Sequence, residues 1–180
     1  MKKLKAICED ILERKNVLTN SQFWLALIIV ILGLLLALGS YLDMIEIIEF
    51  RIAQYTLHHW FTITGTFFIA VFTPIFYFFK RRYINRYKAI LSAHVFGNLI
   101  AFVLITIHFA HQIGRPAQFY PDLGTGIVLY PAVILLVISG FSNRFNLFKG
   151  KRYFSFLHKS VPIMFYFVIV VHLLHGLRII

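Results

Sequence analysis

The chain has 180 residues, of which 59% are hydrophobic, and its mean hydropathy is +0.78. Soluble domains are about half apolar, so this excess, gathered in long blocks, indicates a membrane protein. The net charge of +11 lies mostly in short loops between those blocks, which excludes nucleic acid as the expected partner. The single cysteine, Cys8, excludes an internal disulfide and a cysteine metal cluster. No Gly-rich phosphate loop occurs, so nucleotide or flavin chemistry requires a partner.

Residues 1–20 are predicted to form a cytoplasmic amphipathic segment. Apolar residues within 4–14 follow the i, i+3, i+4 spacing of a helix that lies on a membrane surface. The apolar block that follows begins near Gln22 and is too long for the apolar region of a signal peptide, so we expect it to be retained as a span. Asn20 or Ser21 is placed to cap its start.

The apolar blocks predict five membrane-spanning helices, because about 20 mostly apolar residues cross the hydrocarbon layer. The expected fold is therefore all-α, a single membrane domain over 1–180 with a five-span bundle over 22–180. The stretch 42–55 is expected to form an interfacial helix after the first span. The predicted spans cover residues 22–42, 60–79, 88–111, 124–142 and 154–176.

Positive charge alternates from loop to loop. The N-terminal tail and the loops after the second and fourth predicted spans are rich in Lys and Arg, whereas 43–59 and 112–123 hold few. Cytoplasmic loops of membrane proteins carry the excess of Lys and Arg. We therefore expect a multi-pass protein of the plasma membrane, with the N-terminus in the cytoplasm and the C-terminus outside.

Four of the eight histidines form two pairs of identical spacing. His94 and His108 lie fourteen positions apart in the third span, and His158 and His172 lie fourteen apart in the fifth. Fourteen residues complete nearly four helical turns and rise ~21 Å, so both members of a pair share one helix face. The third and fifth spans run in the same direction. His94 is therefore expected beside His158 on the inner side, and His108 beside His172 on the outer side.

Facing histidines at two levels predict two haem sites in a four-helix core, because a haem iron takes axial ligands from opposite faces and histidine is a usual ligand. Ionisable groups within a membrane are costly and tend to be functional. Two alternatives stay open. The histidines could line a divalent-metal transport path without haem, or they could serve helix packing. Gly97, one turn after His94, would allow either a haem plane or a neighbouring helix to approach closely.

Cations near each level are candidates to bind haem propionates, which need positively charged partners. The same residues also set the topology. The cations in suitable positions are Arg152 and Lys159 near the inner level, and Arg115 and Arg178 near the outer one.

His111 and His175 each follow an outer ligand by three positions. They are out of phase with His94 and His158, so His108 and His172 are preferred as haem ligands. We expect His111 and His175 to bind propionates, protons or an electron acceptor at the outer surface. A metal ion bound there, together with His58 and His59, is a further alternative.

The third span reads HVFGNLIAFVLITIHFAHQIGR and the fifth reads RYFSFLHKSVPIMFYFVIVVHLLHG. Over about half of the chain, these segments resemble the dihaem core of cytochrome b of the bc-type complexes and the ferric reductase-like transmembrane domain. The resemblance implies two haem b groups with histidine axial ligands. The matching positions are His94, Gly97, His108 and Arg115, then Arg152, His158, Pro162 and His172.

The sequence departs from both families. It lacks a bc-type quinol-site loop after the fourth span and has an extra N-terminal span, and we expect the flavin or nicotinamide domain of the ferric reductase family to be absent after Arg178. The resemblance then implies an electron-transfer subunit, with outer-sphere reductase activity as an open question. Its expected donor is a cytosolic flavoprotein reductase or a quinol, and its expected acceptor is an extracytoplasmic redox partner.

Overall fold

The computed structural model describes residues 19–45, 49–118, 123–147 and 150–176. Five helical segments in this part are long and apolar enough to cross a membrane, which confirms a multi-pass, predominantly α-helical membrane protein. The expected surface helix at 4–14 and the cation Arg178 lie outside the described residues. The spanning segments are Ser21–Tyr41, Leu57–Arg82, Ile84–Gly114, Gly126–Phe145 and Arg152–His175.

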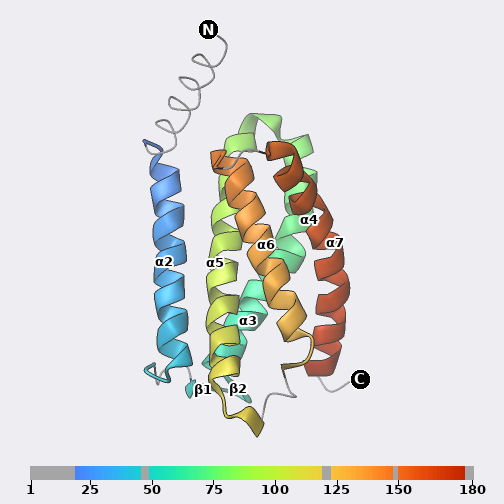
Figure 1. Cartoon of the computed structure of the whole chain (residues 1–180). Coiled ribbons are helices and arrows are strands. Elements are labelled where there is room, and N and C mark those ends of the chain that lie inside the picture. The colour runs from blue at the N-terminus through green and yellow to red at the C-terminus, as the bar shows by residue number, and fades with distance from the viewer. Residues whose placement is uncertain (1–18, 46–48, 119–122, 148–149, 177–180) are drawn as a thin grey trace.

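The first span is helix α2 (Ser21–Tyr41). Asn20 caps it, because the Asn20 side chain accepts a hydrogen bond of 3.0 Å from the Gln22 amide. α2 lies beside α5 (Tyr87–Gly114) at the edge of the bundle (Figure 1). Small residues form the contact: a Cβ on Gly33 would collide with Val103. Ser40 is buried there and donates to the Ile107 carbonyl at 3.4 Å.

The second span joins α3 (Leu57–Phe67), a π-helical turn η2 (Phe68–Phe72) and α4 (Thr73–Arg82). Pro74 has no N–H to donate to the Ala70 carbonyl, so the helix ladder is interrupted there. The Tyr166 hydroxyl of α7 (Lys151–Gly176) compensates, since it donates to the Ile69 carbonyl at 3.1 Å and lies 3.5 Å from the Ala70 carbonyl. This bond ties the second span to the fifth in the middle of the bundle.

A short 3-10 turn, η3 (Ile84–Arg86), leads into α5, and α6 (Gly126–Phe145) and α7 (Lys151–Gly176) complete the bundle. α3 packs against α5, α6 packs against α7, and α5 contacts α6 (Figure 1). α5 and α7 therefore belong to different packed pairs, and α6 between them in sequence makes them run in the same direction. The core contains buried residues from these elements, among them Ile69, Phe102, Val133, Phe165 and Ile169.

The expected interfacial helix at 42–55 is wrong for the described part of that stretch. It contains a turn and a hairpin of β1 (Arg51–Ile52) and β2 (Tyr55–Thr56). Asp43 and Ala53 adopt φ angles of +56° and +57°, which interrupt a right-handed helix. The Trp60 indole donates to the Ile52 carbonyl at 3.2 Å and holds the hairpin against the start of α3.

Candidate functional site

The two predicted histidine pairs lie at two levels of the bundle, one toward each end. We call them the His94 level (His94 and His158) and the His108 level (His108 and His172). At the His94 level, the two imidazole rings approach edge-on, with centroids 6.3 Å apart and planes at 85°. Two imidazoles bound to one metal through bonds of about 2 Å have ring centres roughly 6 Å apart. The spacing at this level therefore suits axial ligation from opposite sides.

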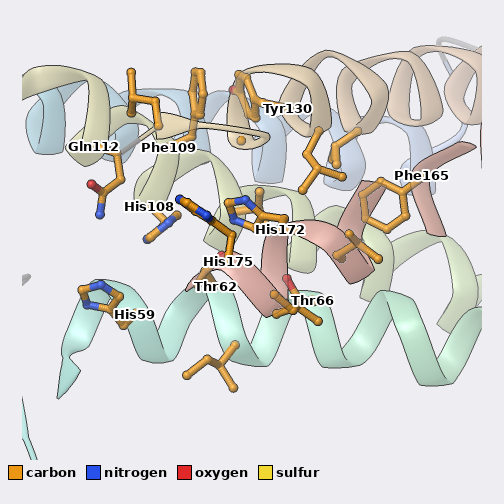
Figure 2. Close-up of a pocket in the computed structure, with 18 of the residues that line it drawn as sticks. His59, Thr62, Thr66, His108, Phe109, Gln112, Tyr130, Phe165, His172 and His175 are labelled. Atoms are coloured by element: carbon orange, nitrogen blue, oxygen red, sulfur yellow. The ribbon is translucent and has the colours of Figure 1, made fainter. Parts of the chain in front are cut away.

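At the His108 level, both histidines line one cavity of about 680 Å³. Side chains of α3, α5, α6 and α7 form its walls. Figure 2 shows His108, His172 and His175 turned toward the same part of the cavity, with His59 of α3 on another wall. Pockets for cofactor-sized molecules hold roughly 300–1,000 Å³. The cavity therefore has the size and the donor groups for a haem, whereas the His94 level has the ligand spacing.

The α7 histidines are hydrogen-bonded to hydroxyl groups of α6. Ser139 Oγ lies 3.1 Å from His158 Nδ1, and Thr125 Oγ1 lies 2.9 Å from His172 Nδ1. Thr125 is the N-cap residue of α6 but makes no side-chain capping bond, so its hydroxyl is directed to His172 instead. A capping bond stabilises a helix by about 1 kcal/mol. These hydroxyl partners were not predicted from the sequence.

A glycine follows each of these hydroxyl residues and lies against the same histidine. A Cβ on Gly140 would lie 3.1 Å from His158 Cε1, and a Cβ on Gly126 would lie 3.4 Å from His172 Cε1. Carbon atoms in ordinary contact are about 3.5–4.0 Å apart. The glycines therefore give the imidazole rings room to lie on α6.

The α5 histidines have different surroundings. The His94 ring stacks on Phe76 of α4, with centroids 4.1 Å apart and planes at 17°. Its Nδ1 lies 3.0 Å from the Asn98 amide nitrogen, which also donates to the His94 carbonyl at 2.7 Å. His108 Nδ1 is buried and has no hydrogen-bond partner in the structure. A buried polar atom without a partner is costly and points to an ion, water or ligand that completes the site.

The cations predicted to bind propionates differ in their surroundings. Arg115 lines the cavity of the His108 level and donates to Gln112 Oε1 at 2.9 Å. Arg152 and Lys159 are exposed on α7 at the opposite end. Lys80 was not among the predicted site residues, yet its Nζ lies 5.3 Å from the centroid of the Phe76 ring that stacks on His94. A cation therefore lies near each level, and a bound haem would need such cations for its propionates.

The remaining histidines of α3 and α5 lie beside His108, whose ring centroid is 5.5 Å from that of His58 and 5.8 Å from that of His59, and His59 also lines the cavity. The His58 ring lies 4.0 Å from that of His59 and 4.3 Å from that of His111, between centroids. Thr56 Oγ1 lies 2.9 Å from His58 Nδ1 and 2.6 Å from His59 Nδ1. Across the described ranges, no three His, Cys, Asp or Glu side chains are arranged to hold a metal ion. Of the two histidines expected to contact propionates or an acceptor, His175 lines the cavity, whereas His111 is not among the lining residues.

Gly97 lies against η2. A Cβ on Gly97 would collide with the Phe68 ring, so the structure shows the helix-contact role for this glycine. Phe68 in turn stacks on Phe72, with centroids 4.7 Å apart.

No protein-family model, curated protein or solved structure matches this chain. Its class is therefore defined by its own fold and site. It is a multi-pass membrane bundle with paired histidines at two levels between α5 and α7.

Proposed function

We propose that this chain is a dihaem b-type cytochrome that transfers electrons across a membrane. The observation that carries the proposal is the facing of His94 and His158 across the bundle, with ring centroids 6.3 Å apart. The same helices carry a second pair fourteen residues later, where His108 and His172 line one cavity. Haem b, when bound, supplies a centre that gains and loses one electron.

The residues of the chain would hold two haem b groups in line along the bundle. α5 provides His94 and His108, α7 provides His158 and His172, and the rise between levels is ~21 Å. Between the levels, the buried side chains of Phe165, Ile69 and Phe102 exclude water. With two histidines holding each haem, the chain would leave no position at the metal for a substrate. Electron transfer is therefore favoured over chemistry at the metal.

We assign the orientation of the chain across the membrane from its charges. Lys80, Arg81, Arg82 and Arg86 lie at the His94 end, so we place that end at the cytoplasmic face of the plasma membrane. The donor in this proposal is a cytosolic flavoprotein reductase or a quinol. The acceptor is an extracytoplasmic redox partner reached from the His108 level, where the cavity is lined by Arg115 and His175.

Cysteine labelling in intact cells tests this orientation. In a Cys8→Ser background, Ala53→Cys in the hairpin turn is expected to react with a membrane-impermeant maleimide added outside. Asn85→Cys in the opposite loop is the matched control, since both residues are exposed, and is expected to react only after lysis. The reverse labelling pattern would contradict the orientation.

Single-histidine variants test the haem assignment. His94→Ala and His158→Ala are each expected to remove the same haem, and His108→Ala and His172→Ala the other. His111→Ala is the matched control: it lies on the same helix as His108, yet it faces His58 and is not among the cavity-lining residues. Reduced-minus-oxidised spectra with haem quantified per chain measure the result. Full haem content in all four ligand variants would refute the assignment.

A further inference from the structure

α6 carries the same short motif twice. A hydroxyl residue followed by glycine occurs at Thr125–Gly126 and again at Ser139–Gly140, fourteen positions apart. This is the spacing of His158 and His172 on α7. Because α6 and α7 are antiparallel neighbours, Ser139 meets His158 and Thr125 meets His172. α6 thus carries a repeat that matches the ligand repeat of α7.

The contacts of Ser139 favour one tautomer of His158. Ser139 Oγ donates its single proton to the Leu136 carbonyl at 3.1 Å. Toward His158 Nδ1, 3.1 Å away, it therefore acts as the acceptor. With Ser139 as the acceptor, we assign the ring proton of His158 to Nδ1, which leaves the lone pair of Nε2 free to bind a metal.

Thr125 is in the equivalent position at the other level. As N-cap residue it would ordinarily accept a bond from an amide of the first helical turn, but it makes no such bond. Its hydroxyl lies 2.9 Å from His172 Nδ1 instead. Gly126 and Gly140 leave space for the two rings beside these hydroxyls, where a Cβ would lie 3.4 Å and 3.1 Å from the ring carbons.

The α5 ligands lack this arrangement. His94 Nδ1 faces an amide nitrogen of Asn98, which is a donor, and His108 Nδ1 has no hydrogen-bond partner. Among the four proposed ligands, only the two α7 histidines therefore have a hydroxyl oxygen at hydrogen-bond distance from Nδ1.

We propose that Ser139 and Thr125 are positioning residues, one for each haem, that hold His158 and His172 with Nδ1 protonated and Nε2 presented as the ligand atom. This inference rests on the proposed haem function. An acceptor on the outer nitrogen raises the basicity of a ligating histidine. Hydrogen bonding of this kind is one of the factors that set haem reduction potentials. Removal of the hydroxyl therefore raises the reduction potential of the haem on that level only.

Redox titration of proteins that retain one haem tests the proposal. In a His108→Ala background, which leaves the His94 level, Ser139→Ala is expected to raise the midpoint potential and Ser139→Thr to restore it. Thr125→Val is the matched control, since its hydroxyl contacts the other level. A His94→Ala background leaves only the haem of the His108 level. There, Thr125→Val is expected to raise the midpoint potential and Thr125→Ser to restore it. Ser139→Ala is now the control and is expected to leave the midpoint potential unchanged. Unchanged potentials in both hydroxyl-free variants would overturn the proposal while leaving the haem assignment intact.

The protonation of the ring is measured independently of haem. Nitrogen-15 NMR of histidine-labelled protein before haem loading, with His158→Gln to assign its signals, should show His158 with the proton on Nδ1. Ser139→Ala should shift that population toward Nε2–H. If the wild-type chain binds no haem, the proposed function fails, and this measurement still decides whether Ser139 sets the tautomer. A wild-type His158 protonated on Nε2 would overturn the inference.

Discussion

Two identical substitutions on α6 provide a sharp test of the site geometry: Gly140→Ala and Gly126→Ala. Each adds one methyl group beside the α7 histidine of one level. At Gly140 the new carbon would lie 3.1 Å from His158 Cε1, and at Gly126 it would lie 3.4 Å from His172 Cε1. Against an ordinary contact of about 3.5–4.0 Å, Gly140→Ala falls short by ~0.4 Å or more, and Gly126→Ala falls near its lower limit.

The shortfall at Gly140 must be relieved by a shift of the His158 ring, because the added carbon belongs to the helix backbone. The ring is also held by Ser139, whose Oγ lies 3.1 Å from Nδ1. Overpacking of a tight site costs about 1–3 kcal/mol. Such a cost corresponds to roughly 5- to 150-fold weaker haem retention at the His94 level. Gly126→Ala is expected to change haem retention at the His108 level by a much smaller factor.

The assay is the rate of haem transfer to excess apomyoglobin, measured in His108→Ala and His94→Ala backgrounds so that each level is followed alone. Overall thermal stability is a poor readout here, because Gly→Ala in a helix also gains up to about 1 kcal/mol of helix propensity. Faster haem loss from the His94 level in Gly140→Ala, with little change for Gly126→Ala, supports the geometry. Equal loss in the two variants, or none in either, would refute the reasoning.

Three further predictions concern packing and charge. Gly97→Ala is expected to destabilise the bundle by about 1–3 kcal/mol through collision with Phe68, and Phe68→Ala in the same chain should recover part of that loss in thermal unfolding. Tyr166→Phe removes the donor to the Ile69 carbonyl and should lower stability by about 0.6–1.7 kcal/mol; an unchanged melting temperature would contradict its bracing role. Arg115→Gln should alter the midpoint potential of the haem at the His108 level and leave the other haem unchanged, and equal shifts of both haems would contradict its placement.

The sequence was sufficient to predict the spans and the two histidine levels. Long apolar blocks have few alternatives to a spanning helix, and a fourteen-residue spacing places two side chains on one helix face. His94 and His158 accordingly face each other at 6.3 Å, and His108 and His172 line one cavity. The hairpin near Ala53 was missed because the apolar residues of 42–55 fit a helical pattern, while the positive φ angles that break it are not visible in such a pattern.

The partners of the histidines could be predicted only in part. The Thr125–Gly126 and Ser139–Gly140 repeat has the ligand spacing and was available in the sequence, but its meaning depends on α6 packing beside α7. Phe76, whose ring stacks on His94, depends on how α4 crosses α5 after the π-helical turn. Contacts between separate helices depend on rotation and crossing angle, which the pattern of a single helix does not determine.

The central claim is that the chain holds two haem b groups, and one measurement tests it most directly. The protein is expressed under haem-replete conditions, purified in detergent, and its oxidised and dithionite-reduced spectra are recorded with haem quantified per chain. We expect a sharp α-band on reduction and about two haems per chain if the proposed histidine pairs each bind one haem. A colourless protein would contradict the claim and would favour a histidine-lined path for divalent metal ions.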